Sequence, residues 1–376
     1  MELLLSVLVC LSLTRTHAQT SERPDCYECD EDLFCNCSAK TLHRVPIVPT
    51  NVLSLDVSFN EIESITEEDL TVYTALRTLK LQKNKLGAIH TDAFHSQSNL
   101  EELDLSFNAL EDISSLWFSS LRSLKHLNIL GNRYTTLGSV GLFQFVENPA
   151  LRTLRFGNPS IEDIKRNMLN KIGRLDELTF VGGKLRSYES GSFKTARPIR
   201  EVSLSLQRLF QDDPALVSKI LRDVSHPETS LIIRDVSLET REPIQAFKEV
   251  RDGSTSRLTF QNTSTTDEGV TLLLEVLDGS PMSYLGLEDI RLVGEGLWER
   301  AWRTHYENLH TMFIRNIEIQ GFFRFSSMIQ LAFLLKPLTK ISVVNATVFV
   351  IPCFTTYFLQ KVEYLDLSQN LLSDIT

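Results

Sequence analysis

The sequence has few of the residues that mark disordered or fibrous chains, and it lacks an excess of positive charge. Only 16 glycines and 12 prolines occur among 376 residues, which argues against disorder and against a collagen-like fibre. The formal net charge is −10, and a chain without a basic excess is a poor candidate for non-specific nucleic-acid binding. We therefore expect a folded protein that does not bind nucleic acid.

Sequence signatures of catalysis are also missing. The chain contains no H-E-x-x-H motif, no G-x-x-x-x-G-K-[ST] phosphate loop and no G-x-S-x-G nucleophile elbow. The eight histidines are scattered, and His90 and His95 have no companion at metal-ligand spacing. Two acidic groups, Glu67-Glu68-Asp69 and Asp212-Asp213, are better explained as solvated turns than as acid–base pairs. We expect neither enzymatic activity, nor a metal site, nor a cofactor.

Long hydrophobic runs are confined to the N-terminus. Leu3–Leu13 is apolar over about the length of a signal-peptide core, and Ala18 is a small residue suited to cleavage. Glu2 stands where a basic residue is usual, and the alternative is a buried N-terminal helix. The run Leu331–Leu335 is far shorter than the ~20 residues that span a bilayer. We expect residues 1–18 to be a signal peptide and this chain to be soluble after export.

Four cysteines crowd together just after the predicted cleavage point. In an exported chain such a cluster is typical of two disulfides, so residues 19–51 are expected to form a disulfide-bonded cap. A zinc site is the alternative, but the spacing C-x2-C-x5-C-x-C lacks two well-separated ligand pairs. The spacing does not fix the connectivity, and Cys353 is left without an evident partner. The four clustered cysteines are Cys26, Cys29, Cys35 and Cys37.

An internal repeat dominates the rest of the chain. Four successive segments match L-x-x-L-x-L-x-x-N-x-L, the leucine-rich repeat, and their asparagines recur at intervals of 24 residues. The L-x-L part is expected to form a short strand with two side chains facing inward. The asparagine amide can bond backbone groups of adjacent turns that would otherwise be buried without partners. The four asparagines are Asn60, Asn84, Asn108 and Asn132.

The repeat pattern predicts an α/β solenoid, a leucine-rich repeat horseshoe with a parallel sheet on its concave face. Thirteen repeats can be aligned: regular ones in 52–150, irregular ones in 151–337, and the start of a truncated C-terminal set in 338–376. Helices or loops are expected on the convex side of the irregular part, as in Asp212–His226 and Asp267–Leu277.

The asparagine position decays in the irregular repeats and returns at Asn370. This decay predicts a change in the sheet, and the alternative is neutral drift without a role in binding. The residues that replace asparagine are Pro159, Gly183, Gln207, Val236, Thr263, Ile290, Ile317 and Ala346.

The sequence resembles the Toll-like receptors over nearly all of its mature length. The resemblance is carried by the opening repeats, by Leu127–Gly138 and by the V-F-V-I-P-C segment Val348–Cys353, which continues into Val362–Ser368. The missing central asparagines together with V-F-x-x-P-C make the resemblance specific. It also implies an N-terminal cap closed by Cys26–Cys35 and Cys29–Cys37.

The resemblance implies a cell-surface receptor of innate immunity that binds bacterial lipoproteins and lipopeptides and triggers inflammatory signalling. Acyl chains are expected to enter a convex-side pocket, and the receptor is expected to pair with a related receptor or with itself. Its membrane contact would lie in segments absent from this sequence. The implied pocket residues are Ile319, Phe322, Phe323, Phe325, Met328, Val348, Phe349, Val350 and Pro352.

The residues of that region allow two further readings. Gly321–Phe325 contributes three aromatics and Met328–Leu335 is almost wholly apolar, which suits a lipid pocket but also suits a packed spine between repeats. The alternative function is an extracellular adhesion or matrix protein that binds protein partners on its concave face.

Three N-x-[ST] sequons, at Asn36, Asn262 and Asn345, are candidate glycosylation sites.

Overall fold

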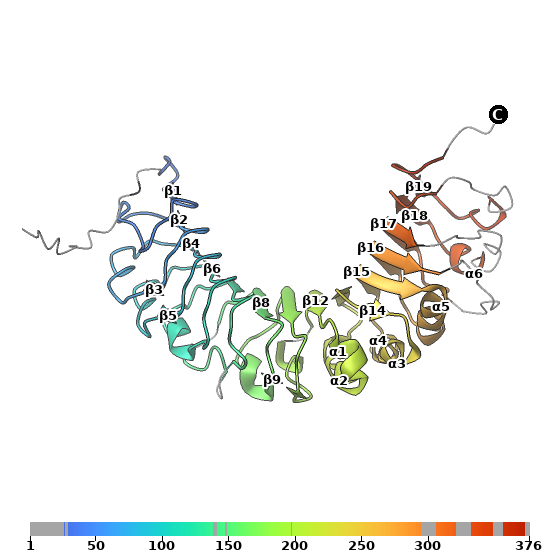
Figure 1. The fold of residues 1–376 in the computed structure, drawn as a ribbon, viewed down its shortest axis with the longest axis horizontal. Helices are drawn as coiled ribbons and strands as arrows, with labels where there is room; N and C mark the ends of the chain where they lie inside the picture. The colour runs from blue at the N-terminus through green and yellow to red at the C-terminus, as the bar shows by residue number, and fades with distance from the viewer. Residues whose placement is uncertain are drawn as a thin grey trace, which may run out of the picture.

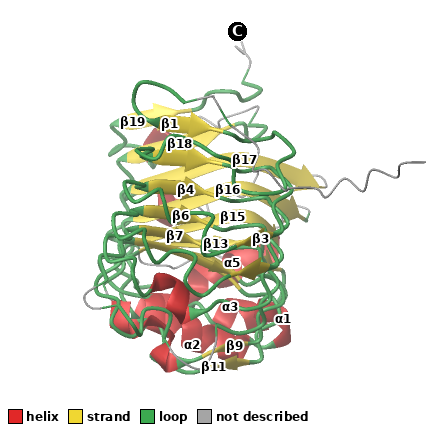
Figure 2. Ribbon diagram, turned by 90° about the vertical axis from the view of Figure 1, so that its left-hand side faces the viewer, coloured by secondary structure: helices red, strands yellow, loops and turns green. Residues whose placement is uncertain are grey.

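The chain folds into a curved solenoid. The computed structural model describes residue 26 and residues 29–137, 141–146, 149–196, 198–294, 306–320, 332–348 and 356–372. Parallel strands line the concave side of an arc, and helices lie on its convex side (Figure 1). Seen from the end of the arc, the strands form one layer with the helices below it (Figure 2). The predicted leucine-rich repeat horseshoe is confirmed.

One parallel sheet runs through the whole array. Its 14 consecutive strands follow one another in chain order, each hydrogen-bonded to the next, as expected when every repeat contacts only its neighbours. The strands are β1 (Phe34–Asn36), β2 (Ser54–Asp56), β4 (Thr78–Lys80), β6 (Glu102–Asp104), β7 (His126–Asn128), β8 (Thr153–Gly157), β10 (Glu177–Val181), β12 (Glu201–Ser205), β13 (Ser230–Arg234), β15 (Arg257–Thr266), β16 (Tyr284–Val293), β17 (Thr311–Gln320), β18 (Lys340–Val344) and β19 (Tyr364–Asp366).

Shorter elements cover the convex side. Of the two segments where helices or loops were expected, one contains the helix α2 (Pro214–Val224) and the other the helix α5 (Asp267–Val276). Asp213 caps α2, because its side chain accepts the Leu216 N–H at 2.9 Å. No helix within the described ranges is long and apolar enough to cross a membrane. The remaining elements are α1 (Leu209–Asp212), α3 (Arg241–Gln245), α4 (Lys248–Asp252), α6 (Ala332–Leu335), three short 3-10 helices (Ser115–Phe118, Arg166–Leu169, Lys194–Ala196), and the strands β3 (Ser64–Ile65), β5 (Ala88–Ile89), β9 (Asp163–Ile164), β11 (Ser187–Tyr188) and β14 (Ser237–Leu238).

The asparagines of the first four repeats form the ladder that the sequence predicts. The Asn108 amide nitrogen donates to the carbonyls of Leu81 and Leu105, both at 3.0 Å. Its oxygen accepts the N–H of Leu86 at 3.1 Å. One buried amide therefore satisfies backbone groups of two successive repeats, where water cannot reach. The ladder consists of Asn60, Asn84, Asn108 and Asn132, all buried.

The fifth repeat departs from the sequence prediction by one residue. Asn158, and not the predicted position Pro159, provides the buried amide, and it donates to the Tyr134 carbonyl at 2.7 Å. The preceding Gly157 has φ 100°, and a Cβ there would lie 2.1 Å from the Val181 carbonyl oxygen. Only glycine fits this close approach of two strands. The residue after this glycine, Asn158, therefore takes the buried position in place of Pro159.

From the eighth to the eleventh repeat, strand pairing takes over the task of the asparagine, and an amide returns at Asn370, which donates to the Leu367 carbonyl at 2.9 Å. At Asp289 the chain passes through φ 54° and then stays extended, so that β16 covers Tyr284–Val293. Beyond this corner Ile290 pairs with Thr263 on one side and Ile317 on the other. Backbone groups now bond one another, and side chains without an amide can occupy the asparagine position. The corner residues are Asp235, Asn262, Asp289, Asn316 and Asn345, whose short polar side chains tolerate the left-handed region.

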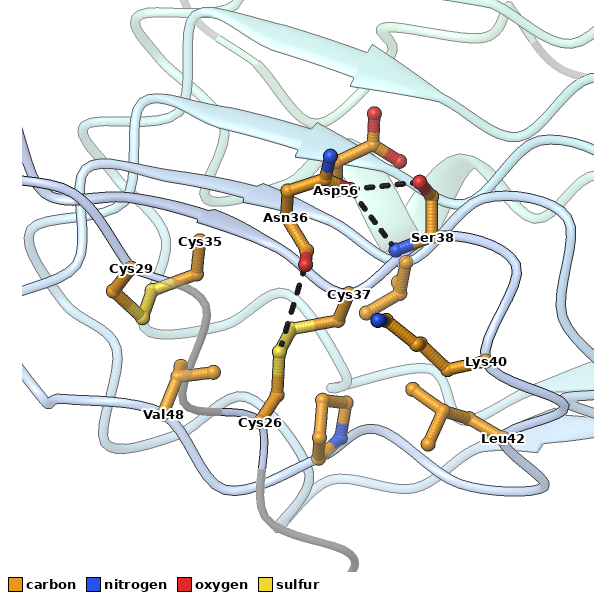
Figure 3. The surroundings of a disulfide bond; sticks show 12 residues. Cys26, Cys29, Cys35, Asn36, Cys37, Ser38, Lys40, Leu42, Val48 and Asp56 are labelled. Carbon is orange, nitrogen blue, oxygen red and sulfur yellow. Dashed lines mark hydrogen bonds between the residues drawn. A yellow bond between two sulfur atoms is a disulfide. The ribbon is translucent and has the colours of Figure 1, made fainter.

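The N-terminal cap corrects the disulfide pairing that the family resemblance implied. The bonds are Cys26–Cys37 and Cys29–Cys35, nested one inside the other (Figure 3), and not Cys26–Cys35 with Cys29–Cys37. The Asp30 side chain accepts the Phe34 N–H at 2.9 Å and closes a tight turn. Because of that turn Cys29 lies directly opposite Cys35, which leaves Cys37, the residue after β1, to bond Cys26.

We predict that Asn108→Ala lowers the free energy of unfolding by about 2–3 kcal/mol, because it leaves buried carbonyls and an N–H unpaired. Asn99→Ala is the matched control, since Asn99 is exposed and its amide makes one hydrogen bond, to Thr74. Urea denaturation followed by circular dichroism measures both. Equal losses for the two variants would contradict the role of the buried ladder.

Candidate functional site

The interior of the C-terminal half contains an apolar cavity of about 330 Å³. It lies between the sheet formed by β15 to β19 and the convex elements α5 and α6. In the shorter repeats the corresponding space is filled by core side chains. Its described lining is Leu238, Phe260, Thr263, Thr265, Val270, Leu273, Leu274, Leu277, Leu285, Leu287, Ile290, Leu292, Met312, Ile314, Ile317, Ile319, Leu334, Leu335, Ile341, Val343, Ala346, Val348, Leu359, Leu365 and Leu367.

Strand alternation explains why one wall of the cavity is so uniformly apolar. In β16, Leu285 and Leu287 line the cavity two residues apart, as alternation along a strand requires. Asp289 then inserts one residue in the left-handed conformation and resets the phase, as a bulge does. Ile290 and Leu292 consequently line the cavity as well. Without this reset the side chain of Asp289, and not that of Ile290, would face the cavity.

The convex wall comes largely from α5. The helix begins with Thr266 as its cap, whose hydroxyl accepts the Gly269 N–H at 3.0 Å, and two acidic residues in its first turn suit the helix dipole. Its apolar stripe faces the strands and supplies Val270, Leu273, Leu274 and Leu277 to the lining. This spacing of three and four residues is the signature of an amphipathic helix.

The few polar groups in the described lining already have partners. The Thr263 hydroxyl donates to the Gln261 carbonyl at 3.3 Å, and the Thr265 hydroxyl donates to the Leu238 carbonyl at 3.0 Å. The asparagine position contributes Thr263, Ile290, Ile317 and Ala346 and therefore no side-chain amide. The described walls offer dispersion contacts and no unsatisfied hydrogen-bonding groups, which suits a flexible hydrocarbon better than a polar ligand.

A second, polar hollow of about 530 Å³ lies on the outer side of the same corner. Side chains of successive corner residues bond one another there: Asn262 donates to Asp235 at 2.7 Å, and Asn316 donates to Asp289 at 2.8 Å. Next to it Asn345 donates to Asn316 at 2.9 Å. The corner thus separates a polar exterior from an apolar interior along the same strands.

The structure brings two of the predicted pocket residues into the cavity wall, Ile319 from β17 and Val348 beyond β18. Phe322, Phe323, Phe325, Met328, Phe349, Val350 and Pro352 lie outside the described residues. Sequence reasoning missed the wall supplied by α5 and by the inward positions of β15 to β18. Period-two alternation, read with a one-residue shift at each corner Asp or Asn, would have found the strand residues.

Comparison with known proteins agrees with the repeat architecture. A leucine rich repeat family model matches residues 74–133. Toll-like receptor 2 type-2 of Gallus gallus is 34% identical over 355 residues, which cover 94% of this chain and 45% of that protein. Toll-like receptor 2 of Macaca mulatta is 33% identical over 378 residues, covering 98% and 46%. The chain belongs to the Toll-like receptor family.

This Toll-like receptor chain spans a little under half the length of the relatives it matches. The similarity extends through the irregular repeats that enclose the cavity, because it covers nearly all of this chain. The relatives that it matches are named as receptors.

We predict that Leu287→Ala destabilises the chain by about 1–2 kcal/mol, whereas Leu105→Ala costs about 3–5 kcal/mol. The two leucines occupy the same repeat position, but Leu105 is fully buried and Leu287 borders the cavity. A side chain beside a void has fewer contacts to lose. Thermal and urea unfolding measure the difference, and a loss at Leu287 as large as that at Leu105 would argue against an open cavity.

Proposed function

We propose that this chain is the ligand-sensing part of a cell-surface receptor of innate immunity, and that its cavity takes an acyl chain of a bacterial lipoprotein or lipopeptide. The observation that carries the proposal is the apolar cavity between the sheet and α5. Its place in the irregular repeats of a Toll-like receptor supports the assignment, as do Ile319 and Val348 in its wall.

The hydrophobic effect is sufficient to drive such binding. Each buried methylene contributes about 0.8 kcal/mol, so a chain of about fifteen methylenes contributes roughly 12 kcal/mol before opposing terms. Loss of translational freedom and ordering of the lipid oppose this by several kcal/mol. The remainder supports binding without any hydrogen bond to the lipid tail, in keeping with the apolar lining.

We further propose that ligand binding promotes pairing with a related receptor or with a second copy, which starts inflammatory signalling. The family relationship supports this step. The competing function is an adhesion or matrix protein that binds protein partners on its concave face. Lipid binding distinguishes these two functions, because only the receptor function requires lipid in the cavity.

We predict that Ile314→Trp weakens binding of a fluorescent palmitoylated peptide at least tenfold, because the indole fills part of the cavity. Ile314 is a cavity residue packed against the core. Leu274→Phe reduces the space from the α5 wall and should act in the same direction. Fluorescence anisotropy with the purified chain measures the dissociation constants.

Two controls make this experiment decisive. Ile314→Leu keeps the volume nearly constant and should bind like the unmodified chain, and Leu116→Trp places the same indole on a 44% exposed site far from the cavity. Thermal unfolding of each variant checks the fold. Undiminished affinity in folded Ile314→Trp and Leu274→Phe variants would exclude the cavity as the acyl site and leave the adhesion function as the better explanation.

We also propose that Asn36, Asn262 and Asn345 carry N-linked glycans. All three side chains are exposed. The Asn262 and Asn345 amides each donate one hydrogen bond, to Asp235 and to Asn316. Each amide nitrogen has a second hydrogen, so glycan attachment is compatible with the corner ladder.

Each sequon can be removed without touching its asparagine. We predict that Ser38→Ala, Ser264→Ala and Thr347→Ala, expressed in a secreting eukaryotic host, each lose one glycosidase-sensitive step in gel mobility. Ser237→Ala is the matched control for Ser264→Ala, since both hydroxyls donate to Glu239 but Ser237 belongs to no sequon. An unchanged ladder of bands after removal of a sequon would show that its asparagine is unmodified.

A further inference from the structure

The concave face changes its charge along the array, although the chain as a whole has a net charge of −10. On strands β6 to β12 the outward positions carry four carboxylates and one cation: Glu102, Asp104, Glu177, Glu201 and Arg155. On β13 to β18 they carry four cations and one carboxylate: Arg234, Arg257, Arg315, Lys340 and Glu288. We call the outward side chains of β13 to β18 the cationic face; they include Tyr284 and Phe313 as well as these charged residues.

The cations of this face form no ion pair with another described residue, although Glu288 lies opposite Arg315 in the strand register. Elsewhere arginines pair with carboxylates on neighbouring strands, as Arg155 does with Glu177 at 2.7 Å. No ion pair between described residues includes Arg257, Arg315 or Lys340, all of which are exposed. Unpaired arginines on a strand face are available to bind a carboxylate from outside, and their five N–H donors suit bidentate contacts.

Two aromatic rings hold these arginines in place. The Arg257 guanidinium lies 4.0 Å from the centre of the Tyr284 ring, and the Arg315 guanidinium lies 5.1 Å from the centre of the Phe313 ring. Such stacking fixes a guanidinium and leaves the edge that carries its N–H groups free. Burial raises the pKa of Tyr284, whereas Arg257 and Arg315 act to lower it and Glu288 adds to the rise.

Gly286 leaves room for this arrangement. It lies between Thr259 and Phe313 in the strand register. A Cβ at this position would come within 3.1 Å of a Tyr284 ring carbon and 3.0 Å of the Thr259 side chain. The tyrosine ring therefore leans over the glycine, which leaves the Tyr284 ring accessible to Arg257. A stacked Arg–Tyr pair next to a second Arg–Phe pair is the result.

The composition of the cationic face favours a protein as its partner. Arginine, tyrosine and phenylalanine are enriched in protein interfaces, and arginine and tyrosine are prominent among residues that carry most of the binding energy. Tyr284 and Phe313 are half-buried, so each still offers surface for contact. Ile232, also half-buried on β13, adds an aliphatic contact at one edge.

We propose that the concave face of β13 to β18 docks an acidic segment of a partner protein, with Arg257 and Arg315 binding its carboxylates and Tyr284 and Phe313 contacting its apolar atoms. Opposite charges speed the encounter, and the acidic half of the concave face, β6 to β12, repels the same segment and so fixes its position. This surface is separate from the acyl cavity, because it lies on the opposite side of the same strands.

The experiment uses the purified chain and a fluorescein-labelled copolymer of glutamate and tyrosine as an acidic peptide probe. We expect saturable binding that weakens with added salt. The double variant Arg257→Glu, Arg315→Glu should weaken it at least tenfold. The neutral pair Arg257→Gln, Arg315→Gln should give a smaller loss of the same sign, and Phe313→Ala should lower affinity about fivefold.

The matched control is Lys184→Glu with Lys219→Glu, which changes the net charge equally at two exposed residues off the concave face. It should change the affinity less than twofold. Absence of saturable binding to the unmodified chain, or an equal loss in the control, would overturn the proposal. So would heparin fragments binding with the same dependence on Arg257 and Arg315 while the peptide does not, since the partner would then be an anionic polysaccharide.

Discussion

The structure depends on how each turn satisfies its backbone hydrogen bonds at the corner where the chain leaves the concave strand. These N–H and C=O groups are buried between neighbouring repeats, so each must bond protein and not water. The first four repeats use one asparagine amide each, as Asn108 shows. The later repeats use longer strands, which pair on both sides of the corner.

The second solution changes what the interior can contain. An asparagine ladder places a polar amide inside every repeat, with partners that fix its position. Once the strands pair directly, the same position can be isoleucine, as at Ile290 and Ile317. The corner Asp or Asn keeps its polar side chain outside and resets the alternation. An apolar cavity is thus found in the repeats where the asparagines are absent.

The long strands present two chemically different surfaces on alternate residues. In β17, Met312 and Ile314 line the cavity, whereas Phe313 and Arg315 belong to the cationic face. Adjacent residues of one strand can therefore be altered separately. This arrangement would let a single segment of the receptor bind a lipid on its inner side and a protein on its concave side.

The regular repeats of this Toll-like receptor chain were determined by the sequence itself. Their period, their inward leucines and the role of Asn60 to Asn132 follow from local pattern, because each repeat contacts only its neighbours. The convex helices α2 and α5 lie in the two segments where helices or loops were expected, and their caps and amphipathic spacing are also local features. Loss of the asparagine pattern also marked the segment in which the cavity lies.

Only the tertiary structure decided the rest. The nested pairing of Cys26 with Cys37 depends on a turn at Asp30 that places Cys29 opposite Cys35, and cysteine spacing does not encode that geometry. The shift from Pro159 to Asn158 depends on the approach of Val181 to Gly157. The cavity and the cationic face arise when residues about 27 positions apart are placed in register by strand pairing. Such contacts between repeats are set by the fold, because no single repeat contains both partners.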